Sequence, residues 1–380
     1  MRLPVSAAAA ALLAFACAAH AASGGLDPSF GVGGRVLTDF NLSTDIANAI
    51  ALQADGKLIV VGTTYTDNDY SGEDFAIARY NADGSLDAGF GNGGIVTTVF
   101  PHGSYAFALA LQPDGKIVAA GTDFVDFSSD ASSDTDFALA RYEADGSPDF
   151  TFGSGGQVTT DFERLNDDAF SVLLRPDGRI VAVGSARDRL SDYDFAAARY
   201  MPDGRLDATF GTAGKASTDF SGGFDRARSA VLQADGRIVA AGFAIRPNGS
   251  HENFAAVRYL ADGALDTTFS GDGRVQVSFG SCCQFANKVL LQGNGKLVLA
   301  GYPDSESTDS DFTLARLDPD GSLDATFGVG GRVRTSFGDL NGGANGAVLQ
   351  PDGRIVAVGF QVFYPTPKGV QFALARYLGR

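Results

Sequence analysis

The sequence contains no tryptophan, three cysteines and three histidines among 380 residues. Beyond the N-terminus the histidines are His102 and His251, and neither lies in a His-Glu-x-x-His motif. A Gly-x-Ser-x-Gly motif is also missing, so zinc-protease helices and the nucleophile elbow of α/β-hydrolases are excluded. Two adjacent cysteines, Cys282 and Cys283, do not make a disulfide framework. The lack of tryptophan weakens the hypothesis of a lectin that stacks sugars on aromatic rings, although tyrosine and phenylalanine can take that role.

Long hydrophobic runs are missing too, except at the N-terminus. Arg2 precedes an apolar run of 15 residues, and Ala19-His20-Ala21 supplies a small-x-small cleavage pattern. Because this run is too short to span a bilayer, we interpret residues 1–22 as a secretory signal peptide. A lipoprotein start at Cys17 is the alternative, although Ala14 stands where a larger aliphatic residue is expected. We therefore expect an exported protein that is periplasmic, cell-surface or extracellular and has no transmembrane segment.

Positive charge is scarce. The chain has 29 Lys and Arg against 45 Asp and Glu, and removal of Arg2 with the leader leaves 28 − 45 = −17. A surface of this sign repels nucleic acid and anionic membranes, whereas it suits cations, basic partners or simple solubility. Nucleic acid is therefore excluded as a partner, and no motif requires a cofactor.

The chain is rich in internal repeats. Three phrases recur in a fixed order, six times each, at steps of 58 to 63 residues from about Gly24 to Arg380. They begin with "LDPSFGVGGRVLTDF" at residue 26, "LQADGKLIVVG" at residue 52 and "DFAIARY" at residue 74. We therefore predict a single domain over residues 23–380 that is built from six repeats of about 60 residues.

Each repeat holds four short strand candidates bounded by Gly, Asp and Pro, and no stretch has sustained helical periodicity. In the second phrase, Pro113-Asp114-Gly115 predicts a type I turn closed by a glycine bulge, which makes the flanking strands antiparallel neighbours. Four antiparallel strands repeated six times favour an all-β, six-bladed β-propeller over a solenoid or a sandwich. In the third phrase bulky side chains alternate with alanines, so the bulky face of one blade can pack against the small face of the next.

The chain ends fit a closed ring. If the structural blade is offset from the sequence repeat, the C-terminal strand 371–377 completes the blade begun by residues 33–63, and this mixed blade closes the ring. If blade and repeat coincide, closure rests on side-chain packing alone. We favour the mixed blade, in which the C-terminal strand pairs with the N-terminal blade.

The phrase "DFALARYEADGSPDFTFGSGGQVTTDF" (residues 136–162) and its relatives resemble the delta-60 repeat, a bacterial tandem repeat. The resemblance covers essentially the whole chain after the leader and implies a β-propeller that is exported or surface-associated. It implies no common activity and no catalytic residues. The departures are local, since Asn294 replaces the turn aspartate, Asn253 and Gln371 replace the aspartate that opens the third phrase, and Leu317 replaces its tyrosine.

Antiparallel alternation divides the loops between two rims. The loops of one rim are nearly the same in every repeat, whereas those after the second phrase, on the other rim, differ in every copy. Because individual loops serve binding and repeated positions serve the scaffold, we place the ligand-binding site on the variable rim. Calcium is a candidate ligand there, although solvated Ser- and Asp-rich loops are the simpler interpretation. The candidate residues are Asp67, Asp69, Glu73, Asp130, Asp134, Asp304, Glu306 and Asp309.

A recurring arginine in the third phrase shares a strand face with phenylalanine and a further apolar residue, so its burial requires a carboxylate. The aspartate of the first phrase recurs equally often and is the natural partner. We therefore predict a structural Arg–Asp pair in each blade rather than a ring of cationic ligands. The arginines are Arg79, Arg141, Arg199, Arg258, Arg316 and Arg376, and the aspartates are Asp27, Asp87, Asp149, Asp207, Asp266 and Asp324.

These observations favour an exported binding or scaffold propeller that presents a variable acidic rim to a protein or carbohydrate ligand. Two alternatives stay open: a propeller hydrolase or lyase that uses rim carboxylates, and a calcium-stabilised surface adhesion protein. Aspartates are plentiful enough for acid/base chemistry, but no pair stands out in the sequence, so a binding role is favoured over catalysis. We expect a monomer.

Overall fold

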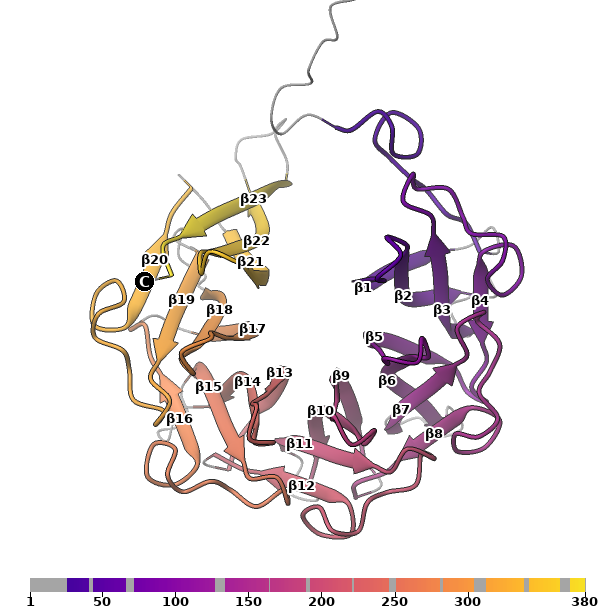
Figure 1. The fold of residues 1–380 in the computed structure, drawn as a ribbon. Helices are drawn as coiled ribbons and strands as arrows, with labels where there is room; N and C mark the ends of the chain where they lie inside the picture. Colours follow the sequence, from indigo (N-terminus) through magenta and orange to yellow (C-terminus); the bar gives the residue numbers. More distant parts are fainter. Residues whose placement is uncertain are drawn as a thin grey trace, which may run out of the picture.

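The protein folds into six β-sheets arranged as propeller blades around a common centre (Figure 1). The structure is a computed structural model, and it describes residues 26–40, 44–65, 72–126, 134–163, 165–188, 192–220, 222–245, 251–280, 283–303, 312–337, 342–362 and 370–379. Residues 1–22, interpreted above as a signal peptide, lie outside these ranges. Within them, no helix is long and apolar enough to cross a membrane.

Five sheets contain four strands each, and the sixth contains three. The first three sheets are formed by β1 (Asp45–Leu52), β2 (Leu58–Tyr65), β3 (Glu73–Tyr80) and β4 (Ile95–Thr98); β5 (Ser104–Leu111), β6 (Ile117–Asp126), β7 (Asp134–Tyr142) and β8 (Gln157–Thr160); β9 (Asp167–Leu174), β10 (Ile180–Arg187), β11 (Tyr193–Tyr200) and β12 (Lys215–Thr218). The last three are formed by β13 (Arg226–Leu232), β14 (Ile238–Ile245), β15 (Glu252–Tyr259) and β16 (Arg274–Val277); β17 (Gln284–Leu291), β18 (Leu297–Pro303), β19 (Phe312–Leu317) and β20 (Arg332–Thr335); β21 (Gly342–Leu349), β22 (Ile355–Val362) and β23 (Val370–Tyr377).

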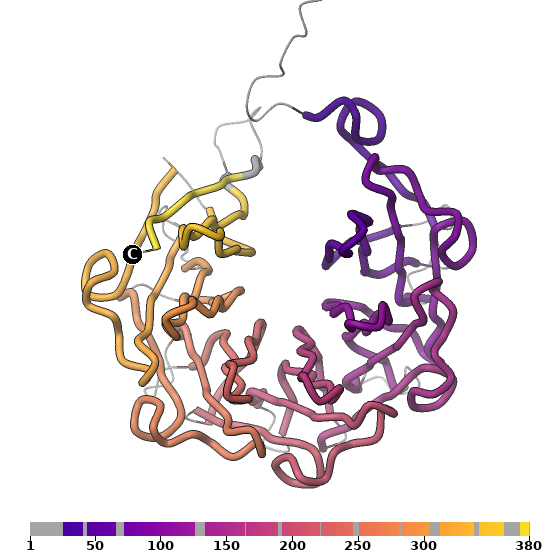
Figure 2. The backbone as a smooth tube through the Cα atoms, in the orientation of Figure 1, coloured from indigo at the N-terminus to yellow at the C-terminus, as the bar shows by residue number. Residues whose placement is uncertain are grey.

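Within each sheet the chain runs outwards, so that β1, β5, β9, β13, β17 and β21 surround the centre (Figures 1 and 2). The hairpin of the second phrase has the predicted turn, in which Gly115 has a φ of 91° and its amide donates to Gln112 O at 3.0 Å. Gly184, which ends the third copy of this phrase, lies opposite a register shift in the inner strand β9. A Cβ on Gly184 would lie 1.8 Å from Asp168 O, so the close backbone approach accepts no side chain here.

Blade and repeat are offset, but not as the sequence analysis proposed. Each four-stranded sheet takes its inner three strands from one repeat and its outer strand from the first phrase of the next. The first phrase stays with the preceding strands because its backbone is tied to them: Asp87 N donates to Arg79 O, and Arg79 N donates to Gly94 O. The sheet that contains β1 and β2 is therefore completed by β3 and β4. The C-terminal strand does not complete the blade begun by residues 33–63; it is the outer strand of the sixth sheet.

Each seam between neighbouring sheets is filled by one apolar cluster. At the first seam, Phe75 and Ile77 of β3 pack with Ala138 and Ala140 of β7, all of them buried. This is the predicted contact between a bulky face and a small face. Tyr142 closes the same seam, where its hydroxyl lies 2.6 Å from Thr98 Oγ1. The clusters at the next four seams have the same construction, so each sheet buries its faces against its neighbours.

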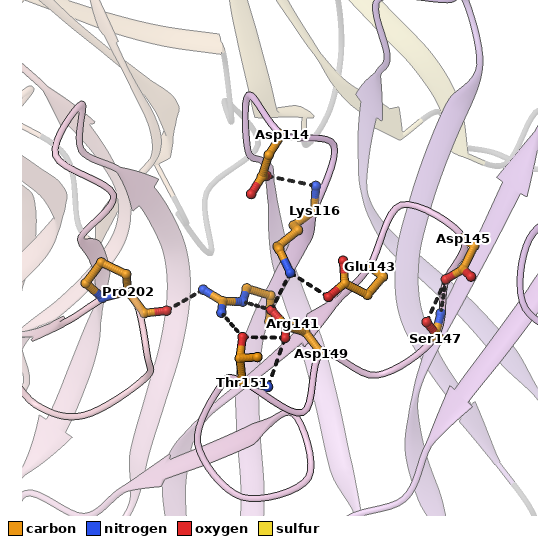
Figure 3. A network of polar contacts seen from close by, with 9 residues as sticks. All are labelled: Asp114, Lys116, Arg141, Glu143, Asp145, Ser147, Asp149, Thr151 and Pro202. Atoms are coloured by element: carbon orange, nitrogen blue, oxygen red, sulfur yellow. Dashed lines mark hydrogen bonds and ion pairs between the residues drawn. The ribbon is translucent and has the colours of Figure 1, made fainter.

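Five Arg–Asp pairs cross-link these seams, as the pair on β7 illustrates (Figure 3). Arg141 Nε donates to Asp149 Oδ2 at 2.6 Å, and its guanidinium lies over the Phe152 ring at 4.6 Å. Arg141 Nη1 also donates to Pro202 O of the next repeat at 2.5 Å. Lys116, from the second phrase, donates to the same carboxylate at 2.9 Å. The other four pairs are Arg79–Asp87, Arg199–Asp207, Arg258–Asp266 and Arg316–Asp324.

The sixth arginine and the first aspartate stand apart. Arg376 is exposed, and the described residues give it no hydrogen bond or ion pair. Asp27 accepts hydrogen bonds from the amide and hydroxyl of Ser29 but forms no ion pair with a described residue. Asp27 belongs to the N-terminal segment and Arg376 to β23, and these two segments lie on opposite sides of the gap between the first and sixth sheets (Figure 1).

Removing Asp207 should destabilise the protein strongly. Its side chain and that of Arg199 are 4% and 6% exposed, so Asp207→Ala leaves a buried guanidinium without its carboxylate. We expect the free energy of unfolding, measured by urea denaturation, to fall by about 3–5 kcal/mol. Asp203→Ala is the matched control, because it removes the partner of Arg205, which is 80% exposed. The control should lose less than about 1 kcal/mol, and equal losses in the two variants would contradict the structural role.

Candidate functional site

Three carboxylates converge on the rim at the seam between the second and third sheets. Asp136 lies near the start of β7, Asp161 directly follows β8, and Asp167 begins β9. One oxygen of each lies within 4.8 Å of the other two. We call these residues the first carboxylate cluster. They lie on the predicted variable rim, since the loops between β6 and β7 and between β8 and β9 both emerge there.

The local chain path positions Asp167. Its side chain is fully buried, and its Oδ2 accepts a hydrogen bond from Phe162 N at 2.7 Å. Its own amide donates to Thr135 Oγ1 on β7 at 3.1 Å. The short loop after β8 thus folds back on itself while β9 is tied to the neighbouring sheet. Carboxylates from two sheets are brought together in this way.

The same arrangement recurs one repeat later. Asp194, Asp219 and Asp225 form the second carboxylate cluster, at the seam between the third and fourth sheets, with one oxygen of each again within 4.8 Å of the others. Asp225 is fully buried and accepts from Phe220 N at 2.8 Å and from Ile245 N at 2.9 Å. An open groove of about 890 Å³ runs alongside, and Asp194, Asp188 and Lys215 are among its lining residues.

Burial raises the pKa values of two carboxyl groups in each cluster towards neutrality. It raises the pKa of Asp167 to about 8, with a further rise from the charges of Asp136 and Asp161, although the hydrogen bond from Phe162 N opposes it. Burial and the Asp161 carboxylate raise the pKa of Asp136 to about 6. In the second cluster burial raises the pKa values of Asp194 and Asp225 to about 7 each. At neutral pH the clusters therefore hold protons that a bound cation would displace.

Two kinds of chemistry suit such clusters. Three carboxylates are the oxygen ligands that calcium prefers, and the backbone hydrogen bonds to Asp167 and Asp225 fix the geometry of one ligand in each cluster. Neighbouring carboxyl groups whose pKa values lie near neutrality can also exchange protons with a bound molecule, as general acids and bases do.

Neither cluster was named by the sequence analysis, although its rim was. Of the eight candidate residues the structure describes two, and Asp67, Asp69, Asp130, Asp304, Glu306 and Asp309 lie outside the described residues, as does Cys282. Glu73 is buried and accepts from the Tyr105 hydroxyl at 3.2 Å, away from both clusters. Asp134 lies next to the first cluster, where its charge adds to the raised pKa of Asp136.

The sequence does carry a signal for the clusters. An aspartate and phenylalanine at the end of the first phrase are followed, six residues after the aspartate, by a second aspartate, as in Asp161 and Asp167 or Asp219 and Asp225. The same spacing occurs at Asp39, before the first sheet. The third member of each cluster, Asp136 or Asp194, is the first residue of the third phrase in the preceding repeat. The sequence does not show that it lies close to the other two, because this depends on how the strands pair.

A comparison with known protein families agrees with the repeated β-propeller fold. A β-propeller family described as a domain of unknown function, DUF5122, matches residues 53–90, 112–152, 175–210, 233–269 and 292–327. The chain belongs to this family. The five matches begin in the second phrase and end in the first phrase of the next repeat, which agrees with the resemblance to a tandem-repeat propeller.

Solved structures are similar to this β-propeller at low sequence identity. A protein of unknown function from Dyadobacter fermentans is 13% identical, with 90% of this chain and 97% of that chain covered and a TM-score of 0.51. An ulvan lyase is 11% identical, with 88% and 84% covered and a TM-score of 0.48. The β-propeller domain of a Pyrococcus furiosus protease, described as having an open velcro topology, is 10% identical, with 89% and 82% covered and a TM-score of 0.42. No curated protein matches the chain in sequence.

The buried carboxyl groups of the β-propeller should make its stability fall as the pH rises. Asp167 keeps its proton in the folded protein up to about pH 8, whereas an aspartate with the ordinary pKa of 3.8 loses it near pH 4. Between these values the folded state binds more protons than the unfolded state, so the free energy of unfolding decreases with increasing pH. We expect the melting temperature to fall between pH 5 and pH 8, and Asp167→Asn to make this dependence shallower. Asp203→Asn, at an exposed site, should keep the native slope; a native slope in Asp167→Asn would refute the assignment.

Proposed function

We propose that this β-propeller is an exported binding module that holds a protein or carbohydrate ligand on its variable rim, through divalent cations bound by the carboxylate clusters. The observation that carries the proposal is the recurrence of three converging carboxylates at the same place in successive seams. A scaffold needs no such arrangement, because the corresponding residues at the next seam are Asn253, Ser278 and Gln284. There Gln284 Oε1 accepts from Phe279 N at 2.7 Å, as Asp167 does from Phe162 N, so the loop folds equally well without charge.

Carboxylates that repel one another favour the binding of a cation, because its positive charge removes the repulsion. Each cluster places carboxyl groups from two sheets in a partly desolvated position, where their charges are screened less than in water. The groups therefore stay partly protonated, and calcium binding would release those protons. A bound calcium could leave coordination positions open to ligand oxygens, since it takes six to eight ligands. The clusters would then act both as cross-links between sheets and as binding centres, which also covers the calcium-stabilised adhesion alternative.

Catalysis is the second candidate function, and one observation favours it. The pKa values of about 6 to 8 in the clusters are those that a general acid or base needs near neutral pH. A hydrolase or lyase would use one cluster directly, and the groove beside the second cluster would receive the substrate. Turnover on a panel of acidic and neutral polysaccharides, lost when the second cluster is neutralised, would support this candidate in place of binding alone.

Calcium titration of suitable variants tests the binding proposal. The neutral seam supplies the substitutions: Asp136→Asn, Asp161→Ser and Asp167→Gln in the first cluster, and Asp194→Asn, Asp219→Ser and Asp225→Gln in the second. We expect calcium between about 0.1 and 1 mM, the range of extracellular calcium modules, to raise the melting temperature of the native protein and to release protons at pH 7. Each triple variant should lose part of this response, and the combined variant all of it.

The controls are the chelated native protein and a variant with the exposed Asp203→Asn substitution, which should respond to calcium as the native protein does. A melting temperature that is the same with calcium and with chelator would contradict the cation sites. A full calcium response in the combined variant would mean that calcium binds elsewhere on the protein.

A further inference from the structure

Arg226 and Arg228 lie at the rim end of β13, one of the strands that surround the centre (Figure 1). The guanidinium of Arg226 lies over the rings of Tyr193 at 3.9 Å and Phe224 at 4.7 Å. It forms no hydrogen bond or ion pair with a described residue, and its Nε is buried without a partner. Ring contacts stabilise a guanidinium but do not satisfy its N–H donors, so Arg226 has donors left for a ligand.

Arg228 has surroundings of the same kind. Its Nη1 donates to Asn287 Oδ1 on β17 at 2.8 Å, and its guanidinium lies 5.2 Å from the centre of the Phe243 ring and 5.7 Å from that of Phe285. No described carboxylate forms an ion pair with it. Burial lowers the pKa of Arg228, and the charge of Arg226 lowers it further. The two guanidinium groups therefore repel each other, and a bound anion would remove the repulsion.

The scaffold does not require cations at these two positions. In the other inner strands the residues equivalent to Arg226 are Ile46, Tyr105, Asp168, Phe285 and Gly343. Those equivalent to Arg228 are Asn48, Phe107, Phe170, Asn287 and Asn345. Neutral side chains can make the contact between neighbouring inner strands, since the ring centres of Phe107 and Phe170 lie 5.1 Å apart. Packing of the sheets therefore does not account for two adjacent guanidinium groups.

The second carboxylate cluster stands beside the two arginines. Asp225 directly precedes Arg226, and Asp194 directly follows Tyr193. The amide of Asp225 donates to Tyr193 O at 2.6 Å, which holds the two strand ends together. Consecutive residues of a strand point to opposite faces, so Arg226 and Tyr193 lie on one side of these strand ends and the carboxylates on the other. A ligand that spans the strand ends therefore contacts both sets of charges.

We propose that Arg226 and Arg228 form an anion subsite, which binds the carboxylate or sulfate group of an acidic carbohydrate. A guanidinium presents paired N–H donors that match two oxygens of such a group, and the exposed Lys288 on β17 adds a third positive charge. The inference rests on the proposed function, since calcium in the second carboxylate cluster would hold hydroxyl oxygens of the same ligand. The ligand is thus held by its acid group on one side of the strand ends and by its hydroxyl groups on the other.

The aromatic side chains of the subsite favour a sugar over an acidic peptide. Phe224 is 37% exposed, and the centre of its ring lies 4.8 Å from that of Tyr193, so an apolar surface is open beside Arg226. The C–H face of a sugar ring can pack on such a surface while its acid and hydroxyl groups reach polar partners. An acidic peptide offers carboxylates on flexible side chains, which lose more conformational entropy on binding and bring no rigid face to the rings.

Titration calorimetry of the full chain with short oligosaccharides tests the subsite. The probes are an oligogalacturonate, which carries carboxylates, a sulfated maltotriose, neutral maltotriose and a hexaglutamate peptide. At pH 7 with calcium, the native protein should bind at least one of the two acidic sugars more tightly than maltotriose and the peptide. Arg226→Gln with Arg228→Gln should weaken that binding by about tenfold to a hundredfold, because hydrogen bonds between charged groups are lost.

Three controls separate binding from folding. The double Gln variant should keep the native rise of melting temperature with calcium, since its carboxylate clusters are unchanged. Arg226→Lys with Arg228→Lys keeps both charges without the paired donors, so it should lose less affinity than the double Gln variant. Arg205→Gln, at a side chain 80% exposed on the opposite rim, should bind the acidic sugar as the native protein does.

Several results would overturn the subsite. Equal affinity of the native protein and the double Gln variant, equal binding of maltotriose, or no binding of either acidic sugar would contradict an anion site, and tighter binding of hexaglutamate would contradict a carbohydrate. Failure of the proposed function is a different result, because it is seen as a missing calcium response in the native protein. Acidic sugar that binds in the presence of chelator, and is lost in the double Gln variant, would support the subsite while contradicting the calcium sites.

Discussion

The seam between neighbouring sheets is the contact on which the rest of the structure depends. A single four-stranded sheet has two faces to bury and no helix to cover them, so it is stable only when both faces are packed against other sheets. The third phrase meets this need because bulky side chains alternate with alanines along it. Each sheet therefore packs its bulky face against one neighbour and its small face against the other. A guanidinium buried at the edge of the seam requires a carboxylate, and its further bond to a backbone carbonyl of the next repeat fixes how two sheets stack.

The carboxylate clusters are a consequence of the same stacking. Asp136 lies beside Asp161 because β7 pairs with β8, and Asp167 joins them because the seam holds β9 against that sheet. Placing three acidic groups together is unfavourable unless protons or a cation neutralise them. The pKa values of Asp136 and Asp167 are accordingly raised, first by burial and then by the neighbouring carboxylates. The next seam, with amide and hydroxyl side chains at the same positions, shows that the scaffold does not require the charges. The fold of the seam therefore does not account for the acidic residues.

Much of the fold could be predicted because it is local. The turn at Pro113-Asp114-Gly115, the antiparallel hairpins and the alternation along the third phrase each depend on a few consecutive residues, and six copies made each signal hard to mistake. The offset of the blade could not be found in this way. Whether the first phrase stays with the preceding strands depends on the backbone bonds between Arg79, Asp87 and Gly94, which are invisible in a strand pattern. The candidate loop residues do not include the cluster residues for a related reason, because a high density of acidic residues in a loop does not show which carboxylates converge.

By itself the sequence determined the number of sheets, the strands within them, the rim on which the copies differ and the need of each recurring arginine for a carboxylate. These features follow from repeat count, side-chain period and the cost of a buried charge, all of which can be read along the chain. Only the tertiary structure decided which first phrase belongs to which sheet, which aspartates meet on the rim and what remains unpaired at the two chain ends. Those outcomes depend on contacts between residues far apart in sequence, and such contacts are set by how one sheet packs on the next.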